Sequence, residues 1–172
     1  KDKGALSSVN VLFNNIGTEQ AQALANILKE HPTLKSLCGN KGNETELNMS
    51  GERNKRLGAE GAVMLASEII DNKALSSLSL SKNALLTKEA GKVIGDMLKG
   101  NSTLKELDLS SNYDYGVGAT DGPGFAQGLA IGIKDNEALS SLNLASNGIG
   151  GYLKYDLFNA TPEGRISYYF CK

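Results

Sequence analysis

Leucine and asparagine recur together, with one spacing, at four places along the chain. The segments LSSLSLSKN at 75–83, LKELDLSSN at 104–112 and LSSLNLASN at 139–147 share the pattern Leu-x-x-Leu-x-Leu-x-x-Asn, and LSSVNVLFN at 6–14 is a looser copy with two valines. Apolar and polar positions alternate within each copy, as in a short strand with one buried face. The recurrence predicts a repeat protein.

A helix is predicted after each strand, because apolar residues then recur at the i, i+3 and i+4 positions of an amphipathic helix. These apolar stripes are Leu24, Ile27 and Leu28; Leu65 and Ile69; Ile94, Met97 and Leu98; and Leu129 and Ile133. Pro32 ends the first helix, and the turns DNKA, GNST and DNEA end the others. One strand and one helix cannot bury their apolar faces alone, whereas stacked copies share a continuous core.

The chain is predicted to form a single domain over 1–172, with about five units. The first leucines of successive units are separated by 28, 41, 29 and 35 residues, which indicates a period of 28–29 with two insertions. The predicted units are 5–33, 34–74 with an insertion, 75–103, 104–138 with an insertion, and 139–172 as an incomplete or capping unit. In the second unit, ELNMS at 46–50 is the predicted strand and 34–43 the predicted inserted loop.

These residues resemble the leucine-rich-repeat family, specifically the ribonuclease-inhibitor-like class found in NOD-like receptors and Ran GTPase-activating proteins. The resemblance covers about 5–150, where the strand pattern is followed by Gly/Ala-x-x-x-Leu-x-x-x-Leu. It implies an α/β fold: a curved solenoid, or horseshoe, with parallel strands on the concave side and helices on the convex side.

The recurring asparagines are predicted to form a structural ladder. Each follows a strand where the chain bends inward, and a buried amide can both donate and accept hydrogen bonds. The ladder residues are Asn14, Asn83, Asn112 and Asn147. The alternative interpretation is a row of asparagines that contacts a ligand.

Composition argues against several classes of partner. The net charge is -1 and no run of Lys or Arg appears, so a nucleic-acid partner is not expected. No apolar run approaches the roughly 20 residues needed to span a membrane. Cys38 and Cys171 are too sparse for a disulfide framework, which favours reduced thiols and a cytoplasmic location, although four Asn-x-Ser/Thr sequons favour the secretory alternative. The chain begins without Met and is expected to be a fragment, with weak self-association of its ends through Tyr168, Tyr169 and Phe170.

Catalytic, metal and cofactor sites are not predicted. His31 is the only histidine, and beside Pro32 it is expected to be solvated or to cap a helix rather than to act as a base. Asp114 and Asp121 lack the further ligands of a calcium loop. One alternative remains for the basic segment GERNKR at 51–56, in which Arg53 or Arg56 serves as an arginine finger for a bound GTPase.

Two surfaces are candidates for binding another protein. The outward strand positions are small and polar and lack the Tyr, Trp or Arg residues that anchor interfaces, so Glu106, Asp108 and Asn143 form the alternative site. The preferred site is the rim of strand-to-helix loops, which carries Tyr113, Tyr115, Tyr152 and Tyr155. The competing interpretation is that these rings only order long loops. The predicted function is a non-enzymatic protein-interaction module from a longer protein; a GTPase-activating regulator and a structural spacer are the alternatives.

Overall fold

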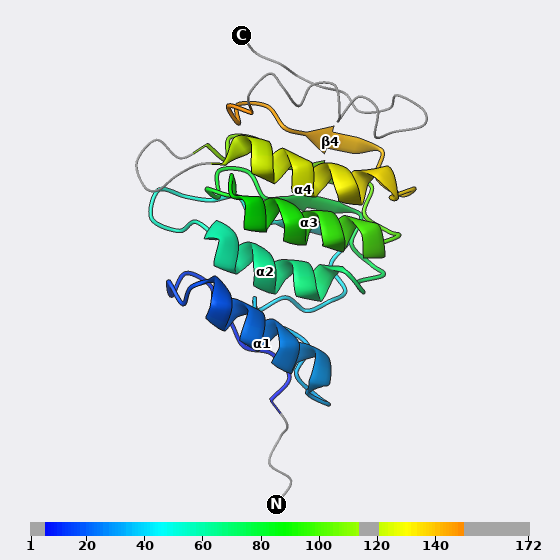
Figure 1. Cartoon of the computed structure of the whole chain (residues 1–172). Coiled ribbons are helices and arrows are strands. Elements are labelled where there is room, and N and C mark those ends of the chain that lie inside the picture. The colour runs from blue at the N-terminus through cyan, green and yellow to red at the C-terminus, as the bar shows by residue number, and fades with distance from the viewer. Residues whose placement is uncertain (1–5, 114–120, 150–172) are drawn as a thin grey trace, which may run out of the picture.

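Four parallel strands alternate with four helices in the computed structural model, which describes residues 6–113 and 121–149. In chain order the elements are α1 (Thr18–Glu30), β1 (Glu46–Asn48), α2 (Gly58–Ile69), β2 (Ser77–Ser79), α3 (Lys88–Gly100), β3 (Glu106–Asp108), α4 (Gly122–Lys134) and β4 (Ser141–Asn143). The strands form one sheet in the order β1-β2-β3-β4, and the helices lie side by side on one face of it (Figure 1). The predicted α/β leucine-rich-repeat solenoid is confirmed.

The strands are stacked in register by one leucine from each unit. Leu47 pairs with Leu78, Leu78 with Leu107, and Leu107 with Leu142. Leu78, Leu107 and Leu142 are all buried under the helices, while the flanking strand residues face away from the core. Insertions do not disturb this register, because the extra residues lie outside the strands.

The apolar stripes predicted for α2, α3 and α4 are buried, but the stripe predicted for α1 is partly wrong. Ala21 and Ala25 form the buried line of α1, whereas the side chain of Ile27 is 49% exposed. The buried residues of this helix are therefore small alanines at i and i+4. A period-3.6 pattern that counts only large residues therefore selects the wrong edge of this helix.

The sequence predicts that 34–43 is an inserted loop, and this prediction is wrong for its first five residues. Residues 34–38 lie beside the looser first copy of the repeat: Ser36 forms a parallel bridge with Ser8, and the Val9 and Val11 N–H groups donate to the carbonyls of Ser36 and Leu37, both at 2.9 Å. Leu34, Leu37 and Cys38 are buried. The second unit thus pairs twice, through 34–38 with the first unit and through β1 with β2 of the third.

Glu68 of α2 bonds to residues of the 36–40 segment. Its carboxylate accepts from the N–H groups of Leu37 (2.6 Å) and Cys38 (2.8 Å) and from the hydroxyl of Ser36 (3.1 Å). It also accepts from Nδ2 of Asn40, at 2.9 Å. A side chain thus supplies the acceptors that an adjacent strand supplies elsewhere in a sheet. We call this contact the seam.

No helix in the described ranges is long and apolar enough to cross a lipid bilayer.

Candidate functional site

The outward side chains of the sheet face bond mainly to one another. The hydroxyls of Ser50 and Ser79 lie 2.9 Å apart, and the Ser81 hydroxyl donates to Ser50 Oγ at 3.0 Å. Ser79 also reaches Asp108 Oδ2, and Ser77 reaches Glu106 Oε2, both at 3.3 Å. These contacts connect three neighbouring strands, so much of the polar capacity of the face is used within the protein.

The turns after β1, β3 and β4 each engage a further acceptor on the sheet face. Asp108 Oδ1 accepts from the Ser110 N–H at 2.9 Å, and Asn143 Oδ1 accepts from the Ala145 N–H at 3.0 Å. Asn48 and Asn10 make the same i to i+2 contact. Two of the three residues of the alternative site, Asp108 and Asn143, therefore have a local structural role, while Glu106 is exposed.

Three of the four recurring asparagines bond from unit to unit. Asn112 Oδ1 accepts from the Asn83 N–H at 2.7 Å, and Asn147 Oδ1 accepts from the Asn112 N–H at 2.6 Å. The amide nitrogens of Asn83, Asn112 and Asn147 donate back to strand carbonyls, and all three residues are buried. Asn14 differs, because its amide bonds only to Val11 and Leu12 of its own unit and is exposed.

A second row of asparagines lies at the ends of the helices. The sequence predicts only turns at these positions. Asn72, Asn101 and Asn136 each accept from the N–H groups two and three residues later. The amides of Asn101 and Asn136 also donate to carbonyls of the preceding unit. The sequence signal that could have identified this row is the Asn that recurs three residues before the first leucine of the third, fourth and fifth units.

His31 takes the corresponding place in the first unit. Its Nδ1 accepts from the N–H groups of Leu34 (2.9 Å) and Thr33 (3.3 Å), the contacts that the asparagine oxygen makes in later units. The ring is thereby committed to the turn that follows α1. The described residues also include no group of three or more His, Cys, Asp or Glu side chains that would hold a metal ion.

Cys38 is a free thiol buried beside the seam. Burial raises its pKa strongly, and the nearby Glu68 carboxylate raises it further through its charge and a hydrogen bond. A buried thiol that resists ionisation is a poor nucleophile. Its environment is that of a core residue.

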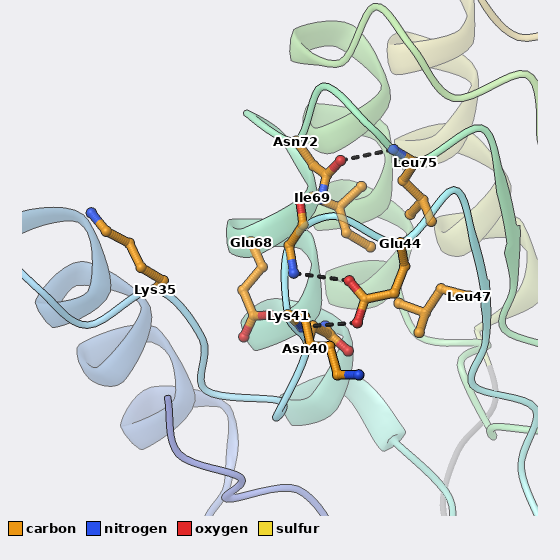
Figure 2. A pocket seen from close by; sticks show the side chains of 10 residues that line it. Lys35, Asn40, Lys41, Glu44, Leu47, Glu68, Ile69, Asn72 and Leu75 are labelled. Atoms are coloured by element: carbon orange, nitrogen blue, oxygen red, sulfur yellow. Dashed lines mark hydrogen bonds between the residues drawn. The ribbon is translucent and has the colours of Figure 1, made fainter. Parts of the chain in front are cut away.

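A small pocket lies next to the seam, between the 40–47 segment and the end of α2 (Figure 2). The Glu44 carboxylate accepts from the N–H groups of Lys41 and Gly42, each at 2.8 Å, and the Lys41 bond above all lowers its pKa. Asn72 Oδ1 accepts from the Leu75 N–H at 2.8 Å. The polar groups that line this pocket are thus engaged in holding its own walls.

The rim of strand-to-helix loops carries a different kind of depression. Three consecutive loops line it, at 51–56, 82–84 and 111–113. They contribute the cations Arg53, Arg56 and Lys82, one acid, Glu52, and the ring of Tyr113. Arg53, Arg56 and Lys82 are exposed, and Tyr113 is 38% exposed. This is the one place in the described residues where a predicted tyrosine and the predicted basic segment meet.

Of the four tyrosines predicted on the rim, the structure describes Tyr113. A Cβ added to Gly148 would lie 3.0 Å from Tyr113 Cδ2, so the ring packs against the loop of the next unit. Tyr115, Tyr152 and Tyr155 lie outside the described residues, as do Tyr168, Tyr169 and Phe170 of the predicted self-association surface. The basic segment and Tyr113 are far apart in the sequence, and no local sequence pattern indicates that Lys82 lies between them.

Comparisons with known proteins place this geometry in context. A leucine-rich-repeat family model matches residues 100–112, which run from the end of α3 through β3 to Asn112. No curated protein matches the chain. The solved structure of leiomodin-1 actin-binding site 2 is 21% identical, with 90% of this chain and 78% of that one covered and a TM-score of 0.48. The tropomodulin C-terminal domain of Caenorhabditis elegans is 13% identical, with 81% and 90% covered and a TM-score of 0.42.

The repeat unit itself defines the fold. Strand, turn and helix recur, leucines stack in register, and buried asparagines connect the units. These features show a leucine-rich-repeat fold, and the leucine-rich-repeat family model matches one unit of it, over 100–112.

Proposed function

We propose that the chain is a non-enzymatic protein-interaction module that binds its partner at the rim. The observation that carries the proposal is the depression formed by Arg53, Lys82 and Tyr113 on three consecutive loops. Arginine and tyrosine are the residue types that most often anchor protein interfaces. A stack of units fixes the spacing of its loops, so the rim presents these groups on a rigid frame.

The sheet face is the second candidate. Its exposed Glu106 is available to a partner, but neighbouring hydroxyls and carboxylates already bond to one another across the strands. A partner that bound there would have to replace those bonds, and an interfacial hydrogen bond that replaces an existing one adds little net affinity. This comparison favours the rim.

The GTPase-activating alternative has weaker support. Arg53 and Arg56 are exposed on the rim, as an arginine finger would have to be, but exposed arginines are equally expected at a protein interface. The comparisons give no support to this activity. Purified chain that accelerates GTP hydrolysis by a small GTPase, with loss of the effect in Arg53→Ala or Arg56→Ala, would establish it.

Photo-crosslinking at chosen positions tests the proposed function. The full-length protein that contains this chain would carry p-benzoylphenylalanine in place of Tyr113 on the rim, Glu106 on the sheet face, or Lys92 on the helix face. After irradiation in cells of the source organism, crosslinked proteins would be identified by mass spectrometry. We expect one specific partner from position 113 and none from position 92, which serves as the control.

The other results of this experiment are equally informative. A partner captured only from position 106 places the site on the sheet face and refutes the rim. No specific partner from either 113 or 106 removes the support for an interaction module and favours the structural spacer.

A further inference from the structure

The basic segment is held rigidly, although it protrudes from the sheet. At its start the Gly51 N–H donates to the Ser81 carbonyl at 2.7 Å, and at its end the Leu57 N–H donates to Asn83 Oδ1 at 3.1 Å. The Gly58 N–H donates to the Asn83 carbonyl at 3.0 Å. We call residues 51–58 the arch, because both ends are fixed to the loop of the third unit.

The middle of the arch is closed by its own backbone. The Glu52 N–H donates to the Lys55 carbonyl at 3.0 Å, and the Lys55 N–H donates to the Glu52 carbonyl at 3.1 Å. This tight turn places Arg53 at the tip. Leu57, only 2% exposed, then anchors the arch in the core. The arch therefore presents its cations from a fixed backbone, so little backbone entropy is lost when a ligand binds.

A close backbone approach brings Lys82 to the same place. A Cβ on Gly51 would overlap the carbonyl of Lys82 and lie 2.8 Å from Asn83 Oδ1, so only glycine allows the two loops to touch. Lys82 itself has φ 61, a left-handed conformation that turns the loop outward. The contact joins the cations of the second and third units at one depression.

Among the described residues that line this depression, the cations outnumber the acids: Arg53, Arg56 and Lys82 lie there together with Glu52. Within the described ranges, neither Arg53 nor Lys82 makes an ion pair, whereas Lys92 and Lys99 on the helices do. Clustered cations raise the local potential and attract an anionic group.

We propose that this depression binds an acidic segment of the partner protein, with aspartate or glutamate carboxylates on Arg53 and Lys82. The inference rests on the proposed function and specifies the partner's chemistry. An arginine guanidinium can hold a carboxylate with two parallel hydrogen bonds, and the lysine adds a second positive charge. The Tyr113 ring supplies an apolar wall for the backbone of the bound segment.

An acidic peptide fits better than a nucleic acid. The adjoining sheet face carries Glu46, Glu106 and Asp108, and the whole chain has a net charge of -1. A polyanion long enough to cover the depression and extend over the sheet would meet these carboxylates, whereas a short acidic segment along the rim would not.

The test uses a fluorescein-labelled hexaglutamate peptide as the probe, measured by fluorescence anisotropy on the chain. We expect saturable binding at low ionic strength that weakens as salt is added. Arg53→Glu with Lys82→Glu should weaken binding about tenfold or more, and Arg53→Gln with Lys82→Gln should weaken it less. Lys29→Glu with Lys73→Glu changes the net charge equally at exposed sites away from the rim, and should leave binding within about twofold of the parent.

Several results would overturn the inference. Hexaglutamate that fails to bind, or that binds the parent and the Arg53→Glu, Lys82→Glu variant equally, excludes the acidic segment. An equal loss in the Lys29→Glu, Lys73→Glu control shows only a net-charge effect and excludes a site. Tighter rim-dependent binding of a six-thymidine oligonucleotide would assign the depression to nucleic acid instead. The photo-crosslinking result does not depend on these measurements, so the proposed function can stand when the inference fails.

Discussion

Gly95 of α3 lies against Gly128 of α4 too closely for a side chain. A Cβ added to Gly95 would lie 3.0 Å from the Gly128 carbonyl carbon and nearer still to its oxygen. Gly91 and Gly132 make similar backbone contacts across the same two helices. Helices usually pack about 8–10 Å apart, while strands in a sheet lie about 4.8 Å apart. The glycine contacts let α3 and α4 approach more closely, so the difference between the helix spacing and the strand spacing is smaller here. Because that difference is what curves the stack, less curvature is expected between these two units.

Gly95→Ala is therefore expected to separate α3 from α4. Overpacking a tight contact costs about 1–3 kcal/mol, and backbone atoms cannot rotate away as a side chain would. Gly122→Ala is the matched control in α4, because its Cβ would meet only ordinary contacts at 3.5 Å or beyond. Urea unfolding should show a lower stability for Gly95→Ala and a change within about 0.5 kcal/mol for Gly122→Ala. Equal stabilities would show that the helices adjust freely.

The asparagine ladder predicts that two asparagines at the same position of the repeat contribute very differently to the free energy of unfolding. Asn112 is fully buried, and its side-chain amide bonds to the Asn83 N–H and the Leu80 carbonyl of the preceding unit and to the Leu109 carbonyl of its own, whereas Asn14 is exposed and bonds within its own turn. Asn112→Ala leaves several buried backbone groups unpaired, at about 1–3 kcal/mol each. Asn14→Ala should cost less than about 1 kcal/mol. Thermal unfolding followed by circular dichroism measures both, and similar losses would contradict the ladder.

The sequence predicted the parts of the fold that depend on neighbouring residues. Period-2 strands and period-3.6 helices follow from local alternation, so β2, β3 and β4 and three of the four helix stripes were placed correctly. The second unit was harder to read, because its signature is divided between Leu34 to Leu37 and Leu47 to Met49. Either half alone resembles a strand, and each pairs with a neighbouring unit, 34–38 with the first and β1 with the third. The sequence pattern assigns the strand of this unit to one of the two halves, whereas in the structure both halves form backbone hydrogen bonds to neighbouring units.

The candidate site was predicted only in part, for a related reason. Tyr113 and the 51–56 segment were each identified, but they are far apart in the sequence. Lys82 brings them together through a backbone contact at Gly51 that no local pattern encodes. In the same way, nothing in the sequence around Glu68 indicates that it bonds to backbone groups 30 and 31 residues earlier.

The contacts of His31 predict that asparagine can replace histidine in the turn after α1. Its Nδ1 accepts hydrogen bonds from the N–H groups two and three residues later, as Asn72 Oδ1 does in the next unit. His31→Asn should therefore keep the stability within about 0.5 kcal/mol, and His31→Ala should lower it by about 1–2 kcal/mol through the lost acceptor. Urea unfolding of the two variants distinguishes these outcomes. If His31→Asn is as unstable as His31→Ala, the ring contributes through packing and not as an acceptor.

The seam predicts that one side chain of α2 holds the 36–40 segment in place beside the first unit. Glu68 supplies the acceptor for the Leu37 and Cys38 N–H groups, which have no strand carbonyl in that direction. Glu68→Ala would leave the Leu37 N–H unpaired and the Cys38 N–H with only the Ser36 hydroxyl, at 3.2 Å. Hydrogen bonds to a charged group contribute about 1.5–3 kcal/mol each. We expect faster amide hydrogen exchange over 34–40 and in α1, with unchanged exchange in β2 and β3, because local opening need not involve the whole stack. Glu30→Ala removes an exposed carboxylate from α1 and serves as the control. If exchange at Leu37 and Cys38 in Glu68→Ala matched that in Glu30→Ala, the carboxylate would not be what closes the seam.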